Sequence, residues 1–222
     1  GYIFTHQDAA ADDVDSDADA NGLTGQYVLA GGETNLSVDA GLAEFTTKDA
    51  SFNFNGSSSG SGTYGNIRTY TDNGVSVNVS AHSRSDKTGE WSTSYLGAFS
   101  GGMGVTNRNE SGSGNSHTVD NIGEMDDYVL FEFDQSVVVD STYLGYVVDD
   151  SDMSVWIGTL DNAFNNHTNL SDDILSQMGF TEINAGSSST RLADLNAGEL
   201  EGNVLIIAAK TSSSNDEFKI QH

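Results

Sequence analysis

The chain has 222 residues, no cysteine and no proline, and 33 acidic residues against eight Lys and Arg give it a formal net charge of −25 at pH 7. This charge makes nucleic acid and anionic membrane surfaces poor partners, and no apolar stretch is long enough to cross a membrane. Without disulfides, stability must come from a large core, bound cations or assembly. The excess of acid suggests cation binding, a saline or marine setting, or both; the alternative is that it simply keeps a secreted protein soluble.

Acidic residues are concentrated near the start of the chain, between residues 8 and 19. The pattern Asp17-x-Asp19-x-Asn21-Gly22 is typical of a tight loop that directs several oxygen ligands at one calcium ion. A complete EF-hand is excluded, because the twelfth position counted from Asp17 is Val28 and not a bidentate Glu. The alternative is a solvated acidic loop. We predict a calcium loop with the ligands Asp12, Asp13, Asp15, Asp17, Asp19 and Asn21.

Two short strands are predicted next, at residues 26–30 and 35–38, with a turn around Gly31-Gly32. Three sequence pieces accompany the Asp-rich run: Gly1-Tyr2-x-Phe4-Thr5, Gly32-Glu33-Thr34-Asn35 and Val38-Asp39-Ala40-Gly41-Leu42. With these pieces, residues 1–42 resemble the C-terminal half of an SdrD B-like (Cna B-type) repeat, a calcium-binding β-sandwich module of bacterial surface adhesins. The resemblance implies a partial Ig-like β module that lacks the first strands of the family.

Half a sandwich leaves edge strands unpaired. The chain is therefore expected to be either a trimmed fragment or a subunit that takes its missing strands from elsewhere. One source is a neighbouring subunit, by strand addition.

From residue 44 onward the sequence has the pattern of a β protein. A hairpin is predicted at residues 67–70 and 75–81, because Asn73-Gly74 suits the positive φ angles of a tight turn. A short helix is predicted at residues 171–178, capped by Ser171 and ended by Gly179. Other strands are predicted at residues 44–48, 51–55, 91–99, 128–133, 137–139, 144–148, 154–159, 204–209 and 218–220, of which 204–209 (VLIIAA) must be central and buried.

These elements predict an all-β protein. The expected architecture is an antiparallel β-sandwich or jelly roll at residues 44–222, preceded by the partial Cna B-type β module at residues 1–43.

The second unit contains five short motifs: Gly104-Val105-Thr106-Asn107, His117-Thr118-Val119-Asp120-Asn121, Phe131-x-Phe133-Asp134, Asp150-Ser151-Asp152 and Asp216-Glu217-Phe218. Through them, residues 45–222 resemble the β-sandwich domain of secreted PEP-CTERM-type bacterial proteins. The resemblance implies a fold and secretion, but no activity, because those domains have no single function.

A second calcium site is predicted in this unit. Acids and an amide surround the Gly-rich loop before residues 128–133, and two more acids precede the last strand. If the loop and the last strand meet at one end of the sandwich, their oxygens form a structural calcium site; the alternative is separate, exposed acids. The expected ligands are Glu110, Asp120, Asn121, Asp127, Asp216 and Glu217. The acids at 149, 150 and 152 are interpreted as a solvated turn.

The sequence carries no zinc spacing, nucleophile elbow, P-loop or dinucleotide fingerprint, and we expect no catalytic activity. Trp91 and Tyr95 are candidates for stacking on a ligand such as polysaccharide, because aromatic faces contact sugar rings. Trp156 lies in an alternating strand, where a core position is favoured.

Together these features predict a secreted, calcium-stabilised structural protein of the bacterial cell surface. It would act in adhesion, or assemble as a homo-oligomer or polymer into an extracellular filament or sheath by strand sharing. The alternative is a non-catalytic carbohydrate-binding module on the same scaffold.

Overall fold

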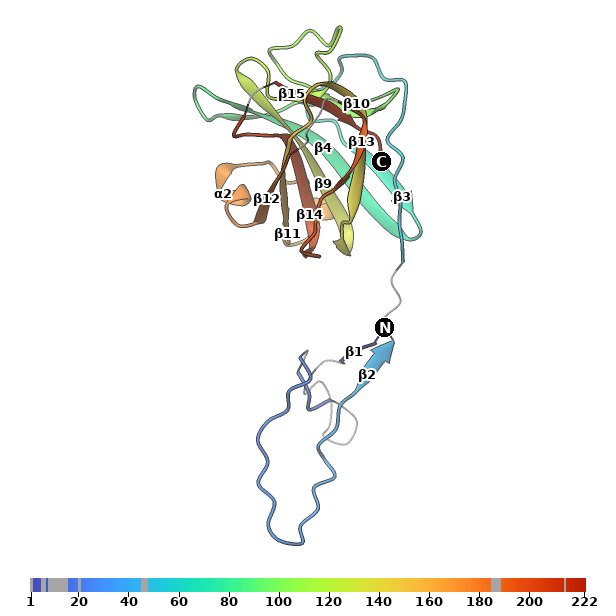
Figure 1. Cartoon of the computed structure of the whole chain (residues 1–222), viewed down its shortest axis with the longest axis vertical. Coiled ribbons are helices and arrows are strands. Elements are labelled where there is room, and N and C mark those ends of the chain that lie inside the picture. Colours follow the sequence, from blue (N-terminus) through green and yellow to red (C-terminus); the bar gives the residue numbers. More distant parts are fainter. Residues whose placement is uncertain are drawn as a thin grey trace. The chain divides into compact units, whose positions relative to one another are not determined.

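The computed structural model describes residues 2–4, 7, 16–19, 21–44, 48–184, 189–213 and 215–222. The chain divides into two compact units, Gly1–Asp49 and Ala50–His222 (Figure 1). The boundary expected at residues 43 and 44 falls inside the first of these units. Among the described residues, no helix has the length and apolarity needed to cross a membrane.

The first unit contains a two-stranded antiparallel sheet, β1 (Tyr2–Phe4) with β2 (Leu42–Glu44). The turn at Gly31-Gly32 forms as predicted, with Gly32 at φ +87° and the Glu33 amide donating to the Ala30 carbonyl at 3.0 Å. The strands predicted at 26–30 and 35–38 are wrong, because these segments run extended without forming a sheet. Val28 and Leu36 are 95% and 89% exposed, so no partner surface within the described residues covers them.

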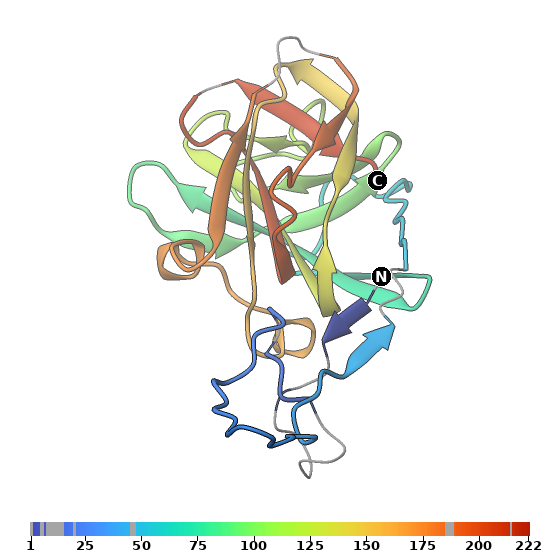
Figure 2. The ribbon, with the colours of Figure 1, turned by 60° about the horizontal axis from the view of Figure 1, so that its bottom comes forward.

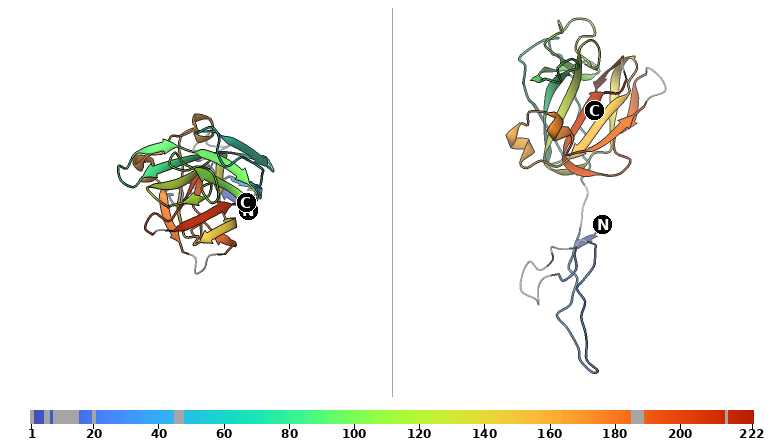
Figure 3. Two further views of the ribbon diagram at one scale, coloured as in Figure 1. Left: turned by 90° about the horizontal axis from the view of Figure 1, so that it is seen from above. Right: turned by 90° about the vertical axis from the view of Figure 1, so that its left-hand side faces the viewer.

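The second unit is a sandwich of two antiparallel sheets (Figure 3). The seven-stranded sheet has the order β12-β11-β14-β9-β4-β3, with β5 paired to β4. Its strands are β3 (Arg68–Asp72), β4 (Val75–Ser85), β5 (Trp91–Thr93), β9 (Met125–Val138), β11 (Met153–Gly158), β12 (Gly179–Ile183) and β14 (Glu201–Ala209).

The six-stranded sheet has the order β13-β10-β15-β7-β6, with β8 paired to β15. Its strands are β6 (Tyr95–Phe99), β7 (Gly102–Thr106), β8 (Val119–Asp120), β10 (Ser141–Asp149), β13 (Arg191–Asp194) and β15 (Asp216–Ile220). Every described strand pair is antiparallel. The prediction of an all-β sandwich is confirmed.

The central strand β14 shows why its sequence is apolar at every position. Leu205 and Ile207 face the core between the sheets, while Val204 and Ile206 face the outer side of the seven-stranded sheet. That outer side is covered by the segment between β11 and β12 (Figure 2). A strand buried on both faces loses the usual alternation of apolar and polar residues.

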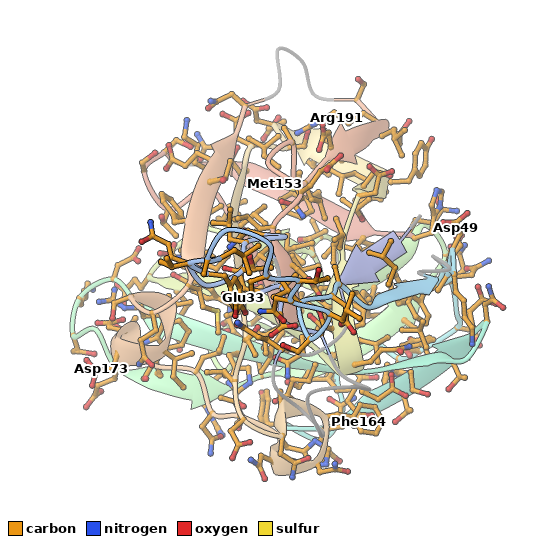
Figure 4. All side chains as sticks on the ribbon, turned by 90° about the horizontal axis from the view of Figure 1, so that it is seen from below. Glu33, Asp49, Met153, Phe164, Asp173 and Arg191 are labelled. Atoms are coloured by element: carbon orange, nitrogen blue, oxygen red, sulfur yellow. The ribbon has the colours of Figure 1, made fainter. Side chains whose placement is uncertain are left out.

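The covering segment contains two short helices, α1 (Ala163–Asn166), which carries Phe164, and α2 (Asp172–Leu175), which carries Asp173 (Figure 4). The Ser171 side chain accepts a hydrogen bond from the Ile174 amide, which confirms the predicted cap. The Asn78 side chain on β4 donates to the Phe164 carbonyl at 2.8 Å and so attaches α1 to the sheet.

Local turns decide two further outcomes. Asn73 and Gly74 have φ angles of +46° and +80°, and the predicted hairpin forms as β3 and β4. The strand predicted at residues 91–99 divides at Ser94 into β5 and β6, which belong to different sheets. Residues 51–55 form no strand, although Phe54 packs in the core and its amide donates to the Gln221 carbonyl at 2.9 Å.

Candidate metal centre

The centre is built around Asp127, whose side chain is fully buried between the sheets. Asp127 lies on β9 opposite Ser83 of β4. Its Oδ1 atom accepts hydrogen bonds from Ser83 Oγ at 2.6 Å and from Asn107 Nδ2 at 3.2 Å. Within the part of the chain that the structure describes, its Oδ2 atom accepts none. A buried carboxylate oxygen without a partner is unfavourable, because it has lost its hydration and gained nothing in return.

Two other carboxyl groups approach Asp127. Glu110 comes from the loop between β7 and β8, and Asp120 comes from β8 in the opposite sheet. One oxygen from each of the three side chains lies within 4.8 Å of the other two. Two oxygens bound to one calcium ion at about 2.4 Å are separated by at most about 4.8 Å. The spacing therefore allows all three carboxylates to bind the same ion.

Hydrogen bonds hold these carboxyl groups in place. The Glu110 Oε2 atom accepts from the Asn107 amide at 2.7 Å. Asp120 accepts from the Ile122 amide at 3.0 Å and from the Thr118 hydroxyl at 3.1 Å. Asn107 thus contacts both Glu110 and Asp127, so the loop after β7 orients two of the three groups.

The electrostatics of the centre are unfavourable for negative charge. Burial raises the pKa of Glu110 to about 7 and that of Asp120 to about 6. The pKa of Asp127 is raised well above its usual value, by burial and then by the charges of Asp120 and Glu110. No Lys or Arg among the described residues forms an ion pair with any of the three. A cation would supply the missing countercharge, and a site made only of oxygens suits a hard ion.

A second acidic group lies near the first and is partly compensated by a lysine and by backbone donors. Asp150, Asp152 and Asp216 also bring oxygens within 4.8 Å of one another. Here the Lys210 ammonium lies 3.5 Å from Asp152, and Asp216 Oδ1 accepts from the Asp152 amide at 3.1 Å. Unlike the first centre, this group therefore has a positively charged side chain of the protein beside it.

The structure divides the predicted second calcium site between these two groups. Glu110, Asp120 and Asp127 meet as expected. Glu217 lies opposite Asp120 in the β8–β15 pair, and both acids accept from the Thr118 hydroxyl. The acids at 150 and 152, interpreted from sequence as a solvated turn, instead meet Asp216, because β15 pairs with β10 and brings the two segments together.

The prediction that Asn121 and Asp216 share a site with Asp127 is corrected, because neither side chain belongs to the first centre. The Asn121 amide group donates to the carbonyls of Lys210 and Ser213 and to Asp216 Oδ2, and its Oδ1 accepts from the Asp216 amide. These hydrogen bonds attach the loop before β15 to the rest of the sandwich. In this structure the Asn121 side chain therefore belongs with Asp216 and not with the first centre.

The predicted N-terminal calcium loop is only partly described, since Asp12, Asp13 and Asp15 lie outside the described residues. Asp17 accepts from the Tyr27 hydroxyl at 3.1 Å and from the Asp39 amide at 2.9 Å. The Asp19 Oδ1 atom accepts from the amides of Asn21 and Leu23, both at 2.9 Å. In the described part of this loop, the carboxylates organise the backbone.

The predicted ligand pair Trp91 and Tyr95 is wrong as a pair. The two residues lie in different sheets, because the chain changes sheet at Ser94. Tyr95 is buried, and its ring lies so close to Gly62 that a Cβ atom there would be 2.4 Å from it. Trp91 is half-buried and remains accessible.

Comparisons with known proteins add no candidate for this centre or for the chain. The sequence and structure match no family model, no curated protein and no solved structure.

Proposed function

We propose that Glu110, Asp120 and Asp127 bind one calcium ion, and that this ion stabilises the sandwich. The observation that carries the proposal is the fully buried Asp127 Oδ2 atom, which has no hydrogen-bond donor among the described residues and faces two more unneutralised carboxyl groups. Three carboxylates supply up to six oxygens, and calcium accepts six to eight oxygen ligands in flexible geometry, whereas magnesium requires a near-ideal octahedron.

The proposed ion would link the two sheets and a loop directly through their side chains. Asp127 belongs to one sheet, Asp120 to the other, and Glu110 to the loop between β7 and β8. The chain has no cysteine, so no disulfide can do this. A bound ion stabilises the folded state by an amount that grows with the logarithm of the calcium concentration above Kd, because the unfolded chain does not hold the three ligands together.

The wider function we propose is that of a non-catalytic structural protein on the bacterial cell surface, in adhesion or in assembly of an extracellular filament or sheath. Its high acidity and the calcium site fit a calcium-rich extracellular setting. The first unit supports assembly, because five of its described apolar side chains are more than half exposed and a second subunit could cover them by strand sharing. These side chains are Leu23, Val28, Leu29, Leu36 and Leu42.

Thermal unfolding of the full chain tests the calcium site. After chelation and dialysis, added calcium is expected to raise the melting temperature, and at one hundred times Kd the stabilisation is about 2.7 kcal/mol. For a chain of this size that corresponds to roughly 5 to 11 °C. Asp127→Asn is expected to abolish the response. The matched control, Asp152→Asn, removes an acid from the second acidic group, at the position paired with Lys210, and is expected to keep the response.

A wild-type melting temperature that calcium leaves unchanged would refute the site, as would an undiminished response in Asp127→Asn. Assembly is tested separately by light scattering and electron microscopy in millimolar calcium and then in chelator. Ordered polymers that dissolve in chelator are expected. A strict monomer at high protein concentration in calcium contradicts the assembly part and leaves the metal site standing.

A further inference from the structure

A cleft lies between the outer face of the seven-stranded sheet and the helix α2. Its volume is about 340 Å³, and ligand sites in proteins typically measure about 300–1,000 Å³. Successive side chains of a strand point to opposite faces of the sheet, so on β9 Asp126 lines the cleft whereas Asp127 points to the metal centre on the other side. The part of the lining that matters here consists of Arg84, Asp86, Asp126, Tyr128, Asp172 and Leu175.

Two acidic side chains of the cleft have no countercharge. The carboxyl groups of Asp86 and Asp126 lie close enough to hydrogen-bond to one another. No Lys or Arg in the described part of the chain forms an ion pair with either of them. Arg84 lies opposite Asp126 in the β4–β9 pair, but its guanidinium binds both carboxylate oxygens of Asp172, at 2.8 and 3.0 Å. The excess negative charge of the cleft is therefore located at Asp86 and Asp126.

The Tyr128 hydroxyl adds a third polar group to the cleft. Tyr128 is only 2% exposed, and its ring packs in the apolar cluster on the outer side of the sheet. Its hydroxyl nevertheless has no hydrogen-bond partner among the described residues, and the protein does not enclose the oxygen completely. Burial raises the pKa of this hydroxyl, and so does the charge of Asp126, while Arg84 lowers it. The oxygen therefore lies among the charged side chains of the cleft, although the ring belongs to the core.

This arrangement favours an organic ammonium group over a metal ion. A primary ammonium group has three N–H donors and no acceptor, and the cleft offers two carboxyl groups and one phenolic oxygen. Calcium takes six to eight oxygen ligands, and neither of the two described groups of converging acids includes Asp86 or Asp126. The cleft is also much larger than an ion, and Leu175 gives its lining an apolar surface for an alkyl chain.

We propose that this cleft binds the primary ammonium group of an alkylamine, which donates to Asp86, Asp126 and Tyr128 while its alkyl chain lies against Leu175. The same chemistry occurs in a free amine and in the side chain of a lysine residue. The site gives the protein a ligand of its own, and it does not rest on the proposed calcium site.

Isothermal titration of the full chain, in calcium and at neutral pH, tests this proposal. The probes are n-pentylamine, Nα-acetyllysine methylamide, tetramethylammonium chloride and pentanol. Pentylamine is expected to bind saturably. Tetramethylammonium has the charge without an N–H donor, and pentanol has the alkyl chain without the charge, so both are expected to bind far more weakly. Binding of the lysine amide as well would support a lysine side chain as the source, whereas binding of pentylamine alone would support a free amine.

Three variants test the proposed contacts. Asp86→Asn and Asp126→Asn each remove one charged acceptor and are expected to weaken pentylamine binding about tenfold to hundredfold. Tyr128→Phe keeps the ring and removes the hydroxyl, and it is expected to weaken binding about twofold to tenfold. The matched control is Asp173→Asn, which removes the same charge from an exposed residue of α2 outside the lining of the cleft. This variant is expected to bind as the wild type does.

The proposal is overturned if pentylamine does not bind, if tetramethylammonium binds as tightly, or if Asp173→Asn weakens binding as much as Asp86→Asn. Melting curves show whether each variant is folded, and the exposed position of Asp86 makes its variant the safest for folding. Asp86→Asn is also expected to keep the calcium-induced rise in melting temperature, so a failure of the amine site and a failure of the calcium site are distinguishable.

Discussion

Acid is expected to destabilise the sandwich through one buried imidazole, that of His82. This residue lies on β4 and is only 5% exposed, with its Nε2 atom 3.4 Å from the Ser80 hydroxyl. Burial lowers the pKa of His82 from 6.5 to about 4, because the charged imidazolium would lose its hydration. Folding therefore keeps the ring neutral at pH values where the unfolded chain takes up a proton.

The sign and size of the effect follow from this difference. The contribution of His82 to stability is complete above pH 6.5, decreases as the pH falls, and is lost at about pH 4. At about 1.4 kcal/mol for each pH unit, the loss is about 3 kcal/mol. Total stabilities of folded proteins are about 5–15 kcal/mol, so the effect is large enough to measure.

Urea unfolding at several pH values between 7.5 and 4 measures it, with wild type and His82→Gln compared in chelator. The buried carboxyl groups have raised pKa values and act in the opposite direction, but they are common to both proteins and cancel in the difference. The stability of wild type relative to His82→Gln is expected to fall by about 3 kcal/mol over this range. His222→Gln, which removes an exposed histidine, is the control. A difference between wild type and His82→Gln that does not change with pH would refute the reasoning.

Two further predictions concern the loops. Asn121→Ala removes an NH2 group whose two hydrogens are shared among three acceptors, and one accepted hydrogen bond. It is expected to cost about 2–3 kcal/mol in urea unfolding, while leaving the calcium-induced rise in melting temperature intact; loss of that rise would restore Asn121 as a ligand. Gly74→Ala places a Cβ atom at φ +80° in the β3–β4 turn and is expected to cost about 1 kcal/mol, whereas an unchanged urea midpoint would show that the turn adapts.

Local signals in the sequence were sufficient for the main strands of the sandwich. Asn73-Gly74 specified a hairpin through backbone geometry alone, and the apolar run at 204–209 required burial on both faces. Ser171 predicted a helix start through its capping hydroxyl. Two of the strands that were missed have weak patterns: β12 is exposed or half-buried along its length, and β8 has only two residues. Such strands form because a neighbouring strand supplies hydrogen-bond partners for their backbone. This pairing cannot be recognised from the sequence of the strand itself.

The sequence was sufficient to predict that acidic residues form the candidate metal centre, but not to predict which of them belong to it. Glu110, Asp120 and Asp127 are close in sequence. One loop and the two strands that follow it, β8 and β9, are therefore enough to bring their side chains together. The second acidic group depends on β15 pairing with β10, a contact between residues more than sixty positions apart. Sequence proximity therefore grouped Asn121 with the first centre, although its side chain bonds to Asp216 of the second group.

The position of β15 constrains how the protein is made. This strand lies inside the six-stranded sheet, between β10 and β7, although it is the last strand of the sandwich in the sequence. During synthesis the six-stranded sheet stays incomplete until β15 has left the ribosome, because β10 and β7 are connected in the sheet through β15. Folding that depends on such distant contacts is slow, and closure of this sheet follows synthesis of β15. The sheet that carries Asp120 therefore reaches its final form only at the last step of folding of the sandwich.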